Sequence, residues 1–216
     1  MGAEEDSVAP IKPQTRGMAR RQAMLDAATD LFLEKGFEGT SLSDIVSRSR
    51  GSRSTLYEQF GNKEGLLRSI VEQLTEQVWP LIGPEDDAGP LTEEGLVDLG
   101  MRFVRAALAP KAIAVFRILV ADGHRVPEII EFFFDSGPRT VERLLARRFR
   151  ERLRPRDGVG TPEEMGQVFL GAVLGVLHTH KVLGLPCRYD DDDGIEAHVR
   201  VAVRIFLDGI GHHRTP

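Results

Sequence analysis

Apolar residues in this chain recur mainly at i, i+3, i+4 and i+7, which is the spacing of one face of an α-helix. No segment shows the alternation of apolar and polar residues that is typical of a strand. Prolines and glycines interrupt the helical pattern and mark where helices end. The pattern predicts an all-α fold of about nine helices, placed at residues 16–35, after Ser41, and at 53–60, 63–79, 91–108, 110–122, 127–153, 162–184 and 194–210.

Two of these helices are short and lie close together in residues 40–60. Their apolar faces consist of Leu42, Ile45 and Val46 in the first helix and of Leu56 and Phe60 in the second. Between them, Gly51 offers a residue for a strained turn and Ser52 can cap the second helix. Two helices joined by a short turn that contains glycine form a helix-turn-helix pattern, whose second helix enters the major groove of DNA. An ordinary helical bundle also contains such pairs, so the pattern alone leaves both interpretations open.

Three motifs around this pair point to a known family. The stretch Met24–Leu67 contains LFLEKGFEGTSLSDI, STLYEQF and NKEGLL in this order. It closely resembles the DNA-binding arm of the TetR/AcrR family of bacterial transcriptional regulators. One position departs from the family pattern, because the turn glycine usually stands one residue earlier and an apolar residue follows it. Here Arg50 precedes Gly51, which predicts a differently shaped turn with an extra cation beside the DNA.

A second resemblance lies in the C-terminal half. The segment VFRILVADGHRVPEIIEFFFDSGPRTVERLL is similar to the C-terminal domain of the AefR-like members of the same family. Together the two resemblances imply three parts: a disordered tail at 1–15, a helix-turn-helix domain at 16–66, and a ligand-binding and dimerisation domain at 67–216.

The helix at 53–60 is the expected recognition helix. If Leu56 and Phe60 face inward, Ser54 and Glu58 point outward. Arg53 can pair bidentately with a guanine or a phosphate, although it could also be a solvated surface charge. Tyr57 matches a family position that contacts phosphate, and packing against the first helix is its alternative. The expected DNA-contacting residues are Thr40, Ser41, Arg50, Ser52, Arg53, Ser54, Thr55, Tyr57 and Lys63.

Glu58 fits this surface poorly, because an acid would face the phosphate-rich groove. It can accept a hydrogen bond from a cytosine amino group, or it can turn into solvent. Thr40, Ser41 and Lys63 stand at expected helix N-termini, where backbone N–H groups favour a phosphate.

The distribution of charge agrees with a basic arm on an acidic body. The whole chain carries a net charge of −5, but residues 12–68 contain ten Lys and Arg against seven Asp and Glu. Residues 69–216 contain eighteen basic against twenty-three acidic residues. Because affinity for DNA depends on local neutralisation of phosphates, the negative total does not argue against DNA binding.

A single arm makes few contacts, so we expect a homodimer that reads a palindromic operator with recognition helices roughly 34–36 Å apart. The family uses its last two helices for a four-helix interface. The alternative is that their apolar residues pack only within their own chain, but both helices look too apolar here to bury one face only. The expected interface residues are Met165, Phe169, Ala172, Val173, Val176, Leu177, Val199, Val203, Phe206 and Ile210.

The family also implies a pocket for a small-molecule effector. Its expected lining residues are Trp79, Met101, Phe103, Phe116, Arg117, Phe133, Phe134 and His178, with Arg117 or His178 as polar anchor. All of them stand at ordinary core spacing, and for any single one core packing is favoured over a role in the pocket. A ligand that prefers the form with splayed arms would release the DNA.

The sequence gives no sign of an enzyme. His178 and His180 are two residues apart on a helix and cannot face one metal ion, and no nucleophile–base motif, P-loop or dinucleotide signature occurs. We therefore expect no cofactor, no metal and no catalytic residue.

The absence of an apolar run of about 18 residues predicts no membrane span. The single cysteine, Cys187, fits a cytoplasmic, nucleoid-associated protein. The alternative function is a helical ligand-binding protein, or an enzyme, without DNA activity.

Overall fold

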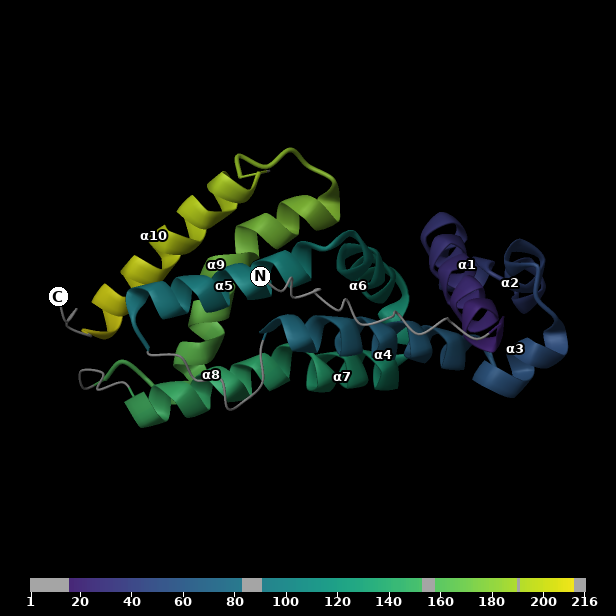
Figure 1. Cartoon of the computed structure of the whole chain (residues 1–216), viewed down its shortest axis with the longest axis horizontal. Coiled ribbons are helices and arrows are strands. Elements are labelled where there is room, and N and C mark those ends of the chain that lie inside the picture. Colours follow the sequence, from purple (N-terminus) through teal and green to yellow (C-terminus); the bar gives the residue numbers. More distant parts are fainter. Residues whose placement is uncertain (1–15, 83–90, 153–157, 190, 212–216) are drawn as a thin grey trace, which may run out of the picture.

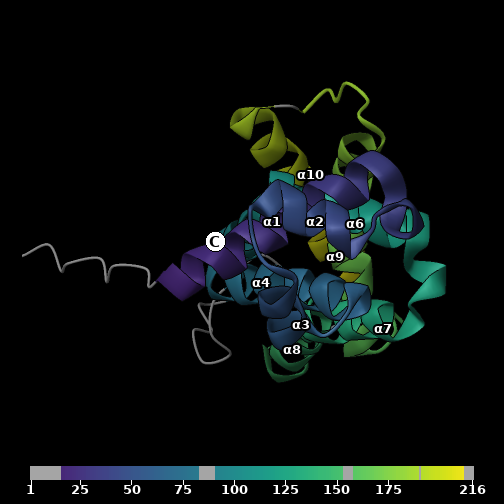
Figure 2. The same cartoon turned by 90° about the vertical axis from the view of Figure 1, so that its right-hand side faces the viewer.

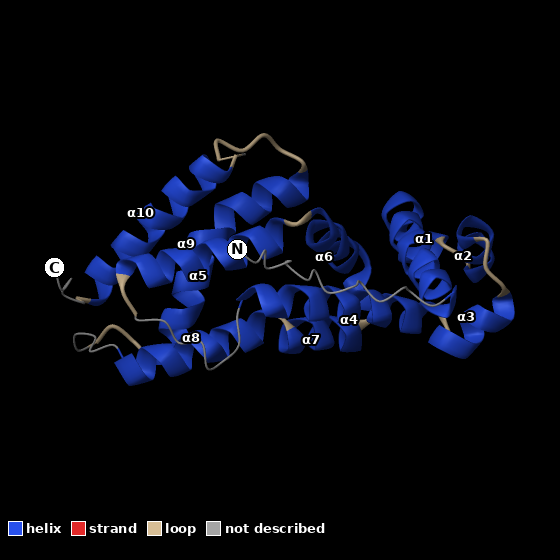
Figure 3. Ribbon diagram, viewed as in Figure 1, coloured by secondary structure: helices blue, strands red, loops and turns tan. Residues whose placement is uncertain are grey.

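The computed structural model describes residues 16–82, 91–152, 158–189 and 191–211, and the expected tail at 1–15 lies outside them. Within these ranges the chain forms helices joined by loops (Figure 3), so the predicted all-α class is confirmed. The elements are α1 (Arg16–Gly39), α2 (Leu42–Ser49), α3 (Arg53–Phe60), α4 (Lys63–Ile82), α5 (Glu93–Leu108), α6 (Pro110–Asp122), the 3₁₀ turn η1 (Gly123–Arg125), α7 (Pro127–Ser136), α8 (Pro138–Arg152), α9 (Pro162–Leu183) and α10 (Asp192–Ile210).

Most predicted helix boundaries agree with the structure, and α3 agrees at both ends. The main difference is the segment 127–153, which was predicted as one helix and forms α7 and α8. Gly137 leaves helical geometry with φ −119° and ψ −99°, and Pro138 starts the next helix. A proline lacks the N–H that a continuing helix needs, but it suits the first turn of a new one. Because of this break, the described part of this segment contains one helix more than predicted.

The end of α1 contains a kink. Gly36 has φ 76° and ψ 166°, a left-handed conformation that glycine adopts without strain. The expected end of the helix at Lys35 is therefore a real break, and a further short turn reaches Gly39.

The molecule is elongated, with α1, α2 and α3 at one end and α5, α8, α9 and α10 at the other (Figure 1). α4 leaves the end that holds α3 and runs into the rest of the protein beside α7. One buried apolar cluster joins α1–α4 with α6 and the beginning of α7. A second cluster joins α5, α8, α9 and α10. The N-terminal helices thus share a core with α6, which gives them a firm attachment to the body.

Candidate nucleic-acid interface and ligand pocket

α2 and α3 are both capped by serine. Ser41 accepts a hydrogen bond from the backbone N–H of Asp44, and the Asp44 carboxylate accepts one from the N–H of Ser41. These bonds hold the pKa of Asp44 below its usual value. Ser52 accepts from the N–H of Thr55 at 3.1 Å and so fixes the first turn of α3. Such reciprocal caps satisfy N–H groups that a helix leaves unpaired at its start.

The turn between α2 and α3 differs from the sequence prediction. The strained residue is Arg50, with φ 52° and ψ 33°, and not Gly51. Gly51 has a different role, because a Cβ there would lie 2.3 Å from the Cε of the buried Met24. The turn therefore uses glycine for close packing on α1, while an arginine occupies the left-handed position that glycine usually fills.

α3 presents a polar face outward. Leu56 and Phe60 are its only buried residues, and Tyr57 is 57% exposed. Figure 2 views the molecule from the end that carries α3 and shows this helix in front. The exposed residues on α3 and its cap are Ser52, Arg53, Ser54, Tyr57, Glu58 and Gln59, with Thr55 half-buried among them.

Arg53 is held in place by a neighbouring helix. Its Nη2 donates to Ser43 Oγ on α2 at 2.8 Å, and the side chain is exposed. The other hydroxyls at this end bond to one another, with Ser52 Oγ 2.8 Å from Thr55 Oγ1 and 3.0 Å from Ser54 Oγ. The surface thus combines a positioned guanidinium with several small hydrogen-bonding groups, which suits the grooves and backbone of a duplex.

Two predicted DNA contacts need correction. The side chain of Thr40 is 2% exposed, and its hydroxyl donates to the carbonyls of Leu31 and Gly36. Lys63 donates through Nζ to three carbonyl groups, those of Phe37, Glu38 and Thr40. Thr40 therefore ties the loop between α1 and α2 to α1, and Lys63 ties it to the start of α4.

α1 and α2 are further joined across their exposed sides. Arg48 donates two hydrogen bonds to the Glu34 carboxylate, at 2.7 and 2.8 Å. This bidentate pair lowers the pKa of Glu34. Because the guanidinium of Arg48 is already paired, it is less available to a phosphate than that of Arg50 or Arg53.

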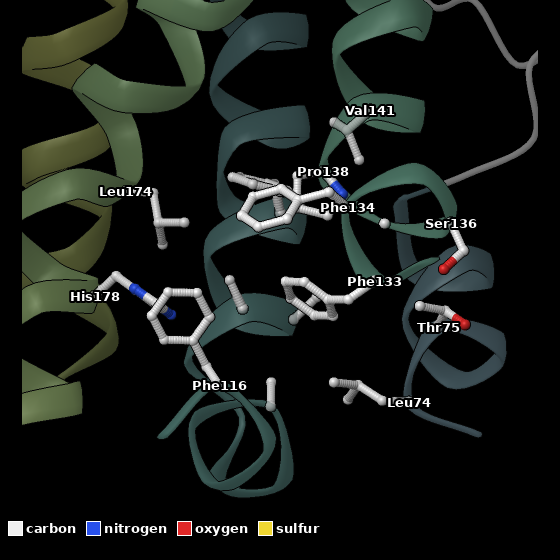
Figure 4. A pocket seen from close by; sticks show the side chains of 15 residues that line it. Leu74, Thr75, Phe116, Phe133, Phe134, Ser136, Pro138, Val141, Leu174 and His178 are labelled. Carbon is white, nitrogen blue, oxygen red and sulfur yellow. The ribbon is translucent and has the colours of Figure 1, made fainter. Parts of the chain in front are cut away.

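A second site is an apolar cavity of about 130 Å³ inside the body, shown in Figure 4. It lies among α4, α5, α6, α7, α8 and α9. Its lining consists of Leu74, Thr75, Phe103, Ala106, Ala107, Ala112, Phe116, Phe133, Phe134, Ser136, Gly137, Pro138, Val141, Leu174 and His178. Of the predicted lining residues, Phe103, Phe116, Phe133, Phe134 and His178 lie there.

Of the other three predicted lining residues, two lie elsewhere in the structure and one has its side chain outside the described part. Met101 is buried in the core formed by α5, α8, α9 and α10. Arg117 turns away from the cavity and donates to the carbonyls of Lys181 and Val182, because the C-terminal end of α9 attracts a cation. The side chain of Trp79 lies outside the described part. Sequence reasoning missed the small residues of the lining, such as Ala107 and Gly137, which carry no signal of their own.

His178 is the polar group of the cavity that is best placed for a ligand. Its ring packs edge-on against Phe116 at 4.5 Å between centroids. Burial lowers the pKa of His178, because the apolar surroundings disfavour the charged ring. The imidazole is therefore neutral at pH 7 and offers one donor and one acceptor.

The predicted dimer interface also needs correction. Eight of its residues are buried in the chain's own core: Met165, Phe169, Val173, Leu177, Val199, Val203, Phe206 and Ile210. Their side chains pack against α5 and α8 within the chain, although Met165, Phe206 and Ile210 also line the groove between α9 and α10. Only Ala172 and Val176 are exposed.

α9 and α10 carry a second apolar face, directed outward. Val168 is 63% exposed on α9, and Val201 and Ile205 on α10 are 54% and 67% exposed. These residues line a groove of about 410 Å³ between the two helices. We call this surface the outer α9–α10 face: Val168, Ala172, Val176, Val201 and Ile205. A second apolar stripe in the sequence could have indicated it, because both helices have apolar residues on more than one side.

Among the described residues, every helix is too short or too polar to span a lipid bilayer. In the same part of the chain, no three His, Cys, Asp or Glu side chains cluster in a way that could hold a metal ion.

Comparison with known proteins agrees with this arrangement. Residues 24–70 match the profile of the bacterial regulatory proteins of the tetR family, and residues 94–209, more than half of the chain, match that of the AefR-like transcriptional repressor C-terminal domain. The Escherichia coli HTH-type transcriptional repressor ComR is 34% identical over 107 residues, which cover 48% of this chain and 49% of ComR. The aligned region thus spans about half the length of this curated relative.

Solved structures match over nearly the whole chain. A Mesorhizobium loti protein assigned to the TetR family superposes with a TM-score of 0.71 at 21% identity, covering 90% of this chain and 98% of that one. The flavonoid-responsive regulator FrrA superposes with a TM-score of 0.69 at 29% identity, covering 88% of this chain and 95% of FrrA.

Proposed function

The chain belongs to the tetR family of bacterial regulatory proteins, and on this basis we propose that it is a transcriptional repressor that binds a palindromic operator as a homodimer. A small molecule in the cavity near His178 releases the DNA. This assignment keeps the division into a DNA-binding domain at 16–66 and a ligand-binding and dimerisation domain at 67–216, in a protein of the cytoplasm that associates with the nucleoid.

The polar face of α3 is the observation that carries the DNA-binding proposal. Arg53 and Tyr57 are exposed there, and the guanidinium of Arg53 is positioned by its hydrogen bond to Ser43. The contacts that we assign to DNA are those of Ser41, Arg50, Ser52, Arg53, Ser54, Thr55 and Tyr57. Thr40 and Lys63 support the loop beside them. The exposed carboxylate of Glu58 leaves both of its expected roles open.

The outer α9–α10 face is the surface that we assign to the dimer. An exposed apolar patch of this kind is rare on a monomer and indicates a protein partner. Gly171, Gly175 and Gly209 have no atom within 4 Å of an added Cβ, so this face is also smooth enough for close approach of a second helix pair. A twofold axis through it would place two copies of α3 at one end of the dimer.

α6 is the candidate link between ligand and DNA. It carries Phe116 into the cavity and packs against α1 at its other end. A ligand that binds better to the form with separated arms weakens DNA binding by no more than its differential affinity for the two forms. FrrA, a relative that responds to flavonoids, supports an effector-controlled function of this kind.

The direct test is fluorescence anisotropy of the full-length protein with labelled DNA from the promoter of its own gene. Saturable binding that weakens with rising salt and is lost with a scrambled sequence supports the proposal. Equal affinity for both DNAs, or none, would favour the alternative of a helical ligand-binding protein or an enzyme without DNA activity. Sequencing the DNA that the protein captures from genomic fragments would then define the operator.

A further inference from the structure

The lining of the cavity near His178 restricts the chemistry of its ligand. We propose that the cavity binds an uncharged, single-ring aromatic compound with one hydroxyl group, a phenol, whose hydroxyl bonds to His178. The inference rests on the proposed function for its regulatory meaning, because the cavity is the one that we assign to the effector. It goes further by naming the class of compound and the residue that selects it.

The lining excludes charged ligands. None of its residues is an acid, a lysine or an arginine. Arg117, which follows Phe116 on α6, is already bound to the two carbonyls at the end of α9. A carboxylate or an ammonium group in this cavity would therefore lose its hydration without gaining a charged partner.

The walls favour a flat ring. Phe116, Phe133 and Phe134 surround the cavity with their rings tilted or perpendicular to one another (Figure 4). The centroids of Phe133 and Phe134 are 5.5 Å apart at an interplanar angle of 79°. A guest ring can add edge-to-face contacts of the same kind, which contribute beyond the area they bury.

His178 is the hydrogen-bonding group that remains for the ligand. The hydroxyl of Thr75 donates to the carbonyl of Glu72 at 2.9 Å, and that of Ser136 donates to the carbonyl of Phe132. The imidazole of His178 packs against Phe116, and none of the described residues hydrogen-bonds to it. In Figure 4 its ring reaches in from α9 beside Phe116. A hydroxyl at this end of the cavity would have a neutral imidazole as its acceptor.

The size sets the number of rings. The cavity measures about 130 Å³. An apolar cavity of roughly 150 Å³ holds a benzene molecule, so one ring can be enclosed here and a fused second ring cannot. The description that follows from charge, shape and size together is a substituted phenol.

The test is isothermal titration of the full-length protein, without DNA, at pH 7.5. The probes are p-cresol, toluene, benzoate, benzylamine and 1-naphthol. We expect binding of p-cresol and toluene, and no measurable binding of the other three. In His178→Leu the affinity for toluene should persist, while the ratio of p-cresol to toluene affinity falls by about tenfold, the effect of one lost hydrogen bond in a double-mutant cycle.

His180→Leu is the matched control, because His180 lies two residues further along α9 and bonds to the carbonyl of Pro186 outside the cavity. It should leave the ratio unchanged. If His178→Leu does not fold, His178→Gln keeps a hydrogen-bonding group and should retain part of the preference for p-cresol. Three outcomes would overturn the inference. The ratio could be unchanged in His178→Leu, benzoate or benzylamine could bind as tightly as p-cresol, or all the neutral compounds could fail to bind. Tight binding of 1-naphthol would overturn the limit to one ring.

Operator binding is measured separately by anisotropy, so the two proposals can fail independently. Loss of ligand binding with intact DNA binding would reject the phenol and leave the repressor. Binding of p-cresol without any DNA binding would reject the repressor and leave the cavity assignment.

Discussion

The carboxylate of Asp122, at the end of α6, accepts a hydrogen bond of 2.8 Å from the backbone N–H of Phe37, past the kink in α1. The carbonyl of the same Phe37 accepts a hydrogen bond from Lys63 Nζ at the start of α4. The segment around Phe37, between the kink in α1 and α2, is therefore held from two sides, by α6 and by α4. α6 also carries Phe116 into the cavity, so a single helix touches both the ligand site and the DNA-binding end.

Asp122→Ala should uncouple the two sites. The variant loses the bond between α6 and Phe37, so we expect ligand and operator each to bind, while the ligand weakens operator binding several-fold less than in the parent protein. Anisotropy titrations of operator DNA with and without ligand measure this coupling. Asp122→Asn, which keeps an oxygen acceptor, is the matched control and should retain most of it. An Ala variant with full coupling would show that the signal takes another path.

Arg53→Ala should weaken specific DNA binding by about 1–3 kcal/mol. The guanidinium is exposed and positioned by Ser43, so its loss removes a contact without disturbing the core. The measurement is a gel-shift titration with operator DNA. Arg143→Ala, on α8 at the other end of the molecule, removes the same charge from the body and should leave the affinity as it was. If both variants bind alike, Arg53 does not contact DNA.

Arg50→Gly should raise stability and lower DNA affinity at once. Arg50 has φ 52°, and a left-handed residue with a side chain costs roughly 1–2 kcal/mol. Glycine removes that cost but loses about 0.5–1 kcal/mol through its more flexible unfolded chain, so we expect a small net gain. Urea unfolding measures the stability, and the salt dependence of operator binding should show about one phosphate contact fewer. A less stable variant would mean that the Arg50 side chain stabilises the turn.

The helices were predictable because local signals specify them. Ser52 before Arg53 and glycine after Phe60 mark α3 in the sequence at both ends. The directions of the side chains were harder to predict. α9 and α10 are apolar on two sides, and only the packing against α5 and α8 decides which side faces inward. Thr40 and Lys63 stand at expected helix starts, but their partners are carbonyl groups on both sides of the kink at Gly36, which the sequence does not place in space.

The cavity could be predicted in part. Aromatic residues on α5, α6 and α7 were the signal, and four of the phenylalanines named from the sequence do line it. Arg117 was wrong as an anchor, because one position along α6 turns a side chain by about 100° and directs it to the end of α9 instead. Such a difference depends on the rotation of one helix, which no local pattern determines.

Ile205→Asp should convert the dimer to a monomer. Ile205 is 67% exposed on the outer α9–α10 face, so an acid there is solvated in a monomer but buried without a partner in a dimer. Light scattering after size exclusion measures the mass, and operator affinity should fall with it. Val120→Asp is the control, because Val120 is 63% exposed on α6, away from this face. A dimeric Ile205→Asp variant would reject the interface assigned to this surface.

The lowered pKa of His178 predicts how acid affects stability. Its folded-state pKa lies below the usual histidine value of 6.5, because burial among apolar residues disfavours the charged ring. No ionisable group lines the cavity around it to compensate. Between pH 6.5 and the lower folded-state pKa, the unfolded chain therefore binds more protons, and the free energy of unfolding falls as the pH falls.

Other groups titrate in the same range, so the comparison is with His178→Leu. Urea unfolding from pH 7.5 to 5.0 should show a smaller loss of stability in this variant than in the parent, and His180→Leu should follow the parent. Equal losses in His178→Leu and the parent would mean that the ring of His178 is protonated without cost, and that the cavity admits water around it.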